Sequence, residues 1–138
     1  MTGPTIPMPG RLRAALALAF LQVLMNGVLA ASAQLQIATQ RSDGEEPFSL
    51  LYAMTCLWYV FAAGLMVSWI AILFGYDWGR WSLLAFEALS TIGGLAGGSL
   101  TAAAGLVLAG LVVTALFREP VTAWFAAKAA QRRASSTI

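Results

Sequence analysis

The sequence contains no histidine, one cysteine and few charged residues. Histidine is the commonest metal ligand and general base, so its absence argues against a zinc site and against Ser-His or Cys-His catalysis. The single cysteine, Cys56, cannot form an internal disulfide, and its place within an apolar run indicates a packing role. The sequence has no glycine loop followed by lysine and no basic stripe that would bind phosphates or nucleic acid. We therefore expect a protein that is not an enzyme, uses no metal or other cofactor and binds no nucleic acid.

Only 10% of the 138 residues are charged, whereas 59% are hydrophobic, and the mean hydropathy is +0.77. Soluble domains carry about 25% charged residues. A soluble domain of this length has too large a surface to be covered by so few charges. The lipid bilayer accepts the surplus apolar residues, so the composition predicts an integral membrane protein.

Four apolar runs suit the hydrocarbon core of a bilayer, which a helix crosses in about 20 residues. They cover residues 14–33, 48–75, 81–98 and 100–117. Residues 1–10 hold three prolines and two glycines and predict a disordered lead. The sequence thus predicts an all-α fold, an integral membrane four-helix bundle over residues 11–117. A cytoplasmic interfacial helix and tail are predicted over residues 118–138.

The first apolar run has a second interpretation. A basic start, an apolar stretch and Ala31-Ser32-Ala33 are typical of a secretory signal peptide with a small-residue cleavage site. The apolar stretch is longer than the usual 7–15 residues of a signal core, which favours an uncleaved helix. The topology of the remaining chain is the same in both cases.

The distribution of basic residues predicts the orientation in the membrane. With the N-terminus inside, seven of the eight basic residues lie on the inner side: Arg11, Arg13, Arg80, Arg118, Lys128, Arg132 and Arg133. The outer side holds Arg41 beside three acids. Because positive charge is retained in the cytoplasm, both termini are expected there, which requires an even number of spans.

A set of aromatic and basic residues is predicted to mark the inner membrane surface. Its members are Trp78, Arg80, Trp81, Trp124, Lys128, Arg132 and Arg133. Tryptophan is enriched at the interface, and Lys and Arg reach lipid phosphates there. In the tail, Val121, Trp124, Phe125 and Lys128 recur at helical spacing, which predicts a short amphipathic helix on the membrane. The alternative is a frayed tail without membrane contact.

Glu87 is the one ionisable residue well inside an apolar run, and such a residue is a functional-site hypothesis. Gln22 and Asn26, one turn apart, are its expected hydrogen-bond partners, with Ser68 near the same depth. One interpretation of this intramembrane polar cluster is a proton- or cation-coupled site. The other is polar glue between helices, or a carboxylate that pairs with Arg80 near the headgroups.

Glycines at four-residue spacing predict close helix packing. They are Gly93 with Gly97, Gly94 with Gly98, and Gly105 on the following run. Small residues at this spacing allow backbones to approach within a membrane. The packing partner is either the neighbouring helix of the same chain, a second copy or a larger protein.

Three segments resemble parts of small four-span membrane proteins of high-GC actinobacteria. They are Arg11-x-Arg13 before an Ala/Leu-rich run, the sequence Gly-Tyr-Asp-Trp-Gly-Arg-Trp at 75–81, and Arg118-Glu119-Pro120 followed by Ala123-Trp124-Phe125. The chain departs from this pattern at Gly79, where alanine is familiar, and at Glu87. The resemblance covers most of the chain and implies a bacterial cytoplasmic membrane location without a known activity.

These features favour an accessory or scaffold subunit of a larger membrane complex. Its partners would be the lipid bilayer and other membrane subunits or a second copy. The alternative function is a minimal oligomeric transporter or channel with an intramembrane carboxylate at Glu87. A third hypothesis is an immunity or stress protein that acts on the membrane.

Overall fold

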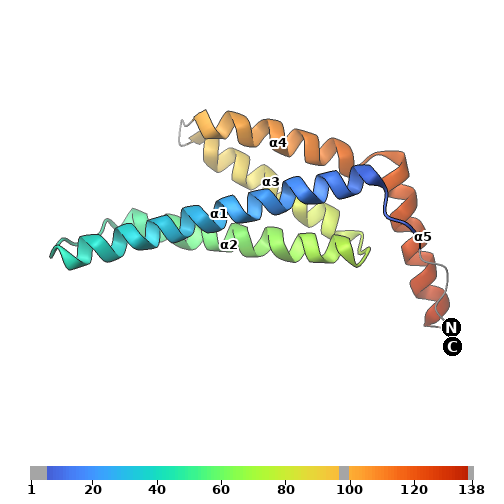
Figure 1. Ribbon diagram of the computed structural model, residues 1–138, viewed down its shortest axis with the longest axis horizontal. Coiled ribbons are helices and arrows are strands. Elements are labelled where there is room, and N and C mark those ends of the chain that lie inside the picture. Colours follow the sequence, from blue (N-terminus) through green and yellow to red (C-terminus); the bar gives the residue numbers. More distant parts are fainter. Residues whose placement is uncertain (1–5, 97–99, 137–138) are drawn as a thin grey trace.

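The computed structural model describes residues 6–96 and 100–136, and for residues 91, 93–96 and 100–105 it describes the backbone alone. The described residues form five α-helices and no strand (Figure 1). The helices are α1 (Gly10–Ser42), α2 (Ser49–Leu73), α3 (Trp78–Ala96), α4 (Leu100–Leu116) and α5 (Glu119–Ser135). The predicted all-α fold is confirmed.

Helix α1 is longer than the first apolar run. The sequence predicts a polar turn from residue 40, but the helix continues to Ser42 and ends at Asp43 and Gly44. The amide of Glu45 donates to the carbonyl of Gln40 at 2.8 Å, and Gly44 has a φ of +78°, which only glycine adopts without strain. The prediction was wrong here because the backbone hydrogen bonds of a helix continue through polar residues until a C-terminal glycine stops them.

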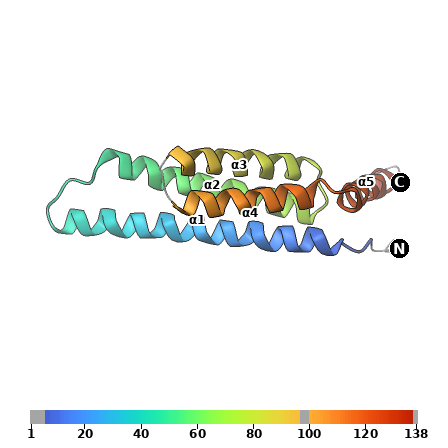
Figure 2. The ribbon, with the colours of Figure 1, turned by 90° about the horizontal axis from the view of Figure 1, so that it is seen from above.

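Helices α1 to α4 run alternately up and down and close a ring of contacts, α1 with α2, α2 with α3, α3 with α4, and α4 with α1 (Figures 1 and 2). The α1–α2 hairpin projects well beyond the end of the α3–α4 pair in both views. Helix α5 lies at the opposite end, where the axis of 119–135 meets that of 106–116 at 57°. The ring is therefore a bundle with one protruding end and one capped end.

The apolar core is concentrated toward the end that α5 caps. Helix α1 contributes buried residues three or four positions apart, which places them on one face. The core consists of Leu12, Ala15, Leu16, Ala19 and Val23 of α1, Leu65 and Ile72 of α2, Leu83 of α3, Val112 and Leu116 of α4, and Val121, Trp124 and Phe125 of α5. Core formation therefore includes α5, which is part of the folded unit.

Two helices, α1 and α2, are long and apolar enough to cross a membrane. The bent pair 106–116 and 119–135 would add a third span if it crossed as one unit. Many large apolar side chains of the described residues are exposed, including Leu24, Val28, Val60 and Val67. Such a surface fits lipid rather than water, and it supports a membrane protein.

Candidate functional site

Glu87 and Gln22 meet in the interior of the bundle. The side-chain Nε2 of Gln22 donates a hydrogen bond of 2.9 Å to Oε2 of Glu87. Glu87 follows the buried Leu83 by one helical turn, and it is only 2% exposed. Helices α1 and α3 are diagonal in the ring, so this bond links elements that share few other contacts. The predicted approach of these two residues is present in the structure.

This pair leaves two buried acceptors without a partner. Neither Oε1 of Glu87 nor Oε1 of Gln22 accepts a hydrogen bond from the described residues. A buried polar oxygen without a donor costs free energy, and most such oxygens in proteins are satisfied. The arrangement has the chemistry to hold a proton or a small monovalent cation between an amide and a carboxylate. No three His, Cys, Asp or Glu side chains come together within residues 6–96 and 100–136 as a polydentate metal site would require.

The other two members of the predicted cluster form hydrogen bonds with groups other than the carboxyl group. Nδ2 of Asn26 donates to the backbone carbonyl of Gln22 at 2.9 Å, within its own helix. The hydroxyl of Ser68 bonds to the carbonyl of Gly64 at 2.7 Å and to the hydroxyl of Ser82 at 2.8 Å. The sequence did not distinguish these cases because Ser and Asn readily bond to the carbonyl one turn earlier. Ser82 was missed because its position gives no signal of a partner.

Arg80 is buried at the joint of α3, α4 and α5, with 6% of its surface exposed. Nη2 forms an ion pair with Asp77, and Nη1 donates to the carbonyl of Leu116 at 3.4 Å and to Oγ1 of Thr122 at 3.3 Å. The guanidinium is the charge partner of Asp77 and not of Glu87. The structure thus differs from the predicted role of Arg80 as a membrane-surface residue, because its guanidinium is enclosed by the protein. The pattern of charges along the sequence indicates how deep a cation lies but not which groups it contacts.

Two phenylalanine rings cover the same guanidinium. Its carbon lies 5.4 Å from the ring centroid of Phe117 and 4.6 Å from that of Phe125. These distances are within the range of cation–π attraction, which arginine favours because its planar group stacks on rings. Arg80 thus fixes the α4–α5 joint through a carbonyl, a hydroxyl and two rings.

No protein-family model, curated protein or solved structure matches this chain. The site is therefore interpreted from its own geometry.

Helix α5 turns its apolar face toward the bundle. Val121, Trp124 and Phe125 are buried in the core, and Nε1 of Trp124 donates to the carbonyl of Ile6 at 3.4 Å. The expected membrane contact of Trp124 is not observed, because the apolar face that the spacing predicts is covered by protein. Lys128 lies over the Trp124 ring at 5.8 Å.

Arg132 binds the C-terminal end of α2. Its guanidinium donates to the carbonyl of Phe74 at 3.0 Å and to that of Gly75 at 2.8 Å, and it lies 4.6 Å from the Tyr76 ring centroid. Carbonyls at a helix C-terminus lack helical partners and carry partial negative charge, so a cation stabilises them. Gly75 makes the turn with a φ of +74°. The sequence did not predict this internal contact, and the contact of Arg132 with lipid phosphate stays a prediction.

The remaining predicted surface residues differ in how far the structure describes them. Trp78, Trp81 and Arg133 are exposed.

The glycines predicted for helix packing are described in part. Gly93 and Gly94 lie in α3 and Gly105 lies in α4, whereas Gly97 and Gly98 lie outside the described residues. The glycine packing of α3 and α4 stays a prediction.

Two packing glycines were missed by the sequence. A Cβ placed on Gly79 would lie 2.9 Å from Cβ of Ala71 and 3.0 Å from the backbone carbonyl of Ser68. A Cβ placed on Gly64 would lie 2.1 Å from the ring of Phe86. Both therefore permit a close approach of α2 and α3. Gly64 has no glycine four residues away, so the signal used does not apply to it. Gly79 lies four residues after Gly75, but it stands between two apolar runs, where no helix packing was predicted.

Proposed function

We propose that this protein is a four-span protein of the bacterial cytoplasmic membrane that serves as an accessory or scaffold subunit of a larger membrane complex. The projecting α1–α2 hairpin carries the proposal. Helices α3 and α4, of 19 and 17 residues, are roughly 28 and 25 Å long, close to the ~30 Å hydrocarbon core. Helix α1, with 33 residues, is roughly 50 Å long. When α3 and α4 fit the bilayer, the α1–α2 hairpin extends past its outer surface.

The burial of charge within α3 supports its insertion. Glu87 points into the bundle toward Gln22, and Arg80 is enclosed by α4 and α5. A charged side chain in contact with acyl chains is costly, whereas one that faces other helices is tolerated. Helix α3 therefore presents few charges to lipid despite its modest hydropathy.

The projecting end carries exposed apolar side chains that lie beyond the hydrocarbon core in the four-span arrangement. Leu35 is 70% exposed, Phe48 is 81% exposed and Leu50 is 67% exposed. Leu35 lies roughly 33 Å along α1 from Arg13, and Gln34 and Gln36 flank it. Large apolar groups beside amides, beyond the hydrocarbon core, are typical of a protein-binding surface. A partner subunit that covers Leu35 and Phe48 accounts for them.

Site-directed crosslinking tests this function. A photoreactive amino acid at position 35 or 48 is expected to crosslink in cells to one protein that also co-purifies stoichiometrically in mild detergent. The same amino acid at position 67, where Val67 is exposed in the C-terminal half of α2, is the matched control and should give no such adduct. A chain that purifies alone, or only as a homo-oligomer, would contradict the accessory role.

A second function, a minimal oligomeric transporter or channel, is favoured by one observation. Glu87 and Gln22 each keep a buried oxygen without a donor inside the bundle, as a proton- or cation-binding site would. Glu87→Gln is then expected to abolish ion flux into proteoliposomes. Glu119→Gln, which removes an exposed acid from the first turn of α5, should leave flux intact. Flux that is absent from the wild type, or unchanged in Glu87→Gln, rejects this candidate.

A further inference from the structure

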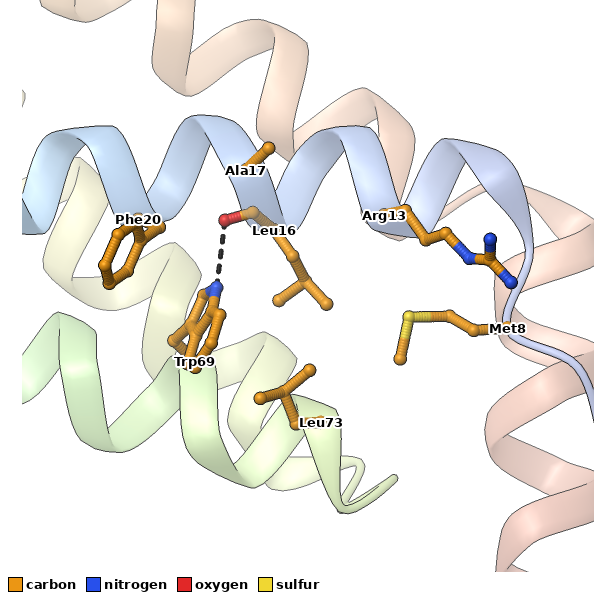
Figure 3. Close-up of a pocket in the computed structure, with 7 residues that line it drawn as sticks. All are labelled: Met8, Arg13, Leu16, Ala17, Phe20, Trp69 and Leu73. Atoms are coloured by element: carbon orange, nitrogen blue, oxygen red, sulfur yellow. Dashed lines mark hydrogen bonds between the residues drawn. The ribbon is translucent and has the colours of Figure 1, made fainter.

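A groove of about 300 Å³ lies between α1 and α2 near the end that α5 caps (Figure 3). Helix α1 supplies four of its lining residues, α2 supplies two, and the segment before α1 supplies one. The lining consists of Met8, Arg13, Leu16, Ala17, Phe20, Trp69 and Leu73. Apart from Arg13, these side chains are apolar or aromatic.

The groove interior has no free hydrogen-bond donor. Nε1 of Trp69 donates to the carbonyl of Leu16 at 2.9 Å, as the dashed line in Figure 3 shows. The Trp69 and Phe20 rings lie 5.4 Å apart and form one apolar wall. An occupant of this stretch therefore gains contact with apolar surface and finds no polar group to bind.

Arg13 stands at one end of the groove. It is exposed, and among the described residues no carboxylate lies within ion-pair distance of it. Figure 3 shows its guanidinium directed toward the segment before α1, at the end of the groove opposite Phe20. The groove thus has an apolar interior and, at one end, a cation that forms no ion pair with the described residues. The complementary ligand is an amphiphile with an anionic headgroup.

We propose that the groove binds an anionic phospholipid, with an acyl chain against Leu16 and Trp69 and the headgroup phosphate at Arg13. Arginine binds phosphate through paired N–H groups, and the inner leaflet supplies anionic lipid at this depth. This inference goes beyond the accessory role and rests only on the membrane location and orientation proposed above. It gives Arg13 a specific ligand. The distribution of basic residues, by contrast, indicates only on which side of the membrane Arg13 lies.

Lipid retention tests the proposal. Full-length protein is reconstituted into bilayers of equal phosphatidylglycerol and phosphatidylcholine, then re-extracted for native mass spectrometry of bound lipid. The wild type is expected to retain phosphatidylglycerol preferentially, and Arg13→Ala to lower that preference about fivefold, as the loss of one direct hydrogen-bonded contact with the headgroup implies. Arg11→Ala removes an equal charge from an exposed residue outside the groove and should keep the preference.

A groove-filling variant tests the acyl-chain contact separately. Ala17→Phe adds an apolar ring to an exposed lining residue without changing charge, and it should reduce retention of both lipids. Equal effects of Arg11→Ala and Arg13→Ala, equal retention of the two lipids, or full retention by Ala17→Phe would each overturn the proposal. Wild-type protein that never enters the bilayer would overturn the membrane location as well, which distinguishes the two failures. Helicity by circular dichroism is measured for every variant, so that loss of lipid is not confused with loss of fold.

Discussion

Gln22 of α1 and Glu87 of α3 are joined by a hydrogen bond of 2.9 Å across the diagonal of the helix ring, although 65 positions separate them in the chain. The bond supplies one donor to a carboxyl group that is buried and has no other hydrogen-bond donor among the described residues. It therefore ties the position of α3 to that of α1 independently of the ring contacts between neighbouring helices.

Removal of the Gln22 amide should destabilise the bundle. Gln22→Leu leaves both oxygens of Glu87 without a donor, and an unsatisfied buried polar group costs about 1–3 kcal/mol. The expected result is a lower thermal midpoint for loss of helicity in detergent. Asn26→Leu is the matched control, because among the described residues the Asn26 side chain donates only to a carbonyl of α1, and its effect should stay within ~0.5 kcal/mol. Equal loss from both variants would contradict a specific role for the Gln22–Glu87 bond.

Replacement of Arg80 should loosen α5 at its joint with α4. Arg80→Met keeps an apolar stem but loses the contacts with Leu116 and Thr122, which link α3 to the α4–α5 joint. Amide hydrogens of α5 are expected to exchange about tenfold faster, while those of α1 stay protected. The reason is that the lost contacts lower the free energy of local opening of α5 alone, by about 1–3 kcal/mol. Arg118→Met, which removes a neighbouring exposed cation, should leave exchange unchanged. Unaltered exchange of α5 in Arg80→Met would show that the joint does not depend on the guanidinium.

A methyl group at Gly79 should separate α2 from α3. The Cβ of alanine would press on the backbone of Ser68 and Ile72, which cannot rotate away, and overpacking of this kind costs about 1–3 kcal/mol. Gly27→Ala is the comparison within α1, since nothing lies within 4 Å of its Cβ, and it should stabilise by up to ~1 kcal/mol through helix propensity. Both values come from reversible unfolding in detergent. A neutral Gly79→Ala would mean that α2 and α3 are less closely packed than described.

The sequence predicts the features that depend on local pattern. Helices, their apolar faces and the exceptional carboxylate at Glu87 follow from composition and 3.6-residue periodicity, and the amide at Gln22 was identified by its depth. The structure agrees because a buried acid in an apolar helix has few polar residues available to it. The helix near Trp124 was likewise predicted from the 3.6-residue spacing of its apolar residues.

The sequence does not predict which surface covers a given face. Arg132 is 57 residues from its acceptor on Gly75, and no local pattern indicates that contact. Trp124 has the spacing of a lipid-facing residue, yet α5 packs against the end of the bundle and buries it. An apolar face indicates only that the face is shielded from water. A neighbouring helix, lipid or a partner subunit can each provide that shielding.

Cysteine labelling of intact cells tests the even number of spans with both ends in the cytoplasm, on which the other proposals rest. Cys56 is exposed and is first replaced by alanine, and single cysteines are then introduced at Asp43, between α1 and α2, and at Ser136, after α5. With an impermeant maleimide, Asp43→Cys should react in intact cells, and Ser136→Cys should react only after permeabilisation. Reaction of Ser136→Cys in intact cells, or protection of Asp43→Cys, would contradict a four-span protein with both ends in the cytoplasm.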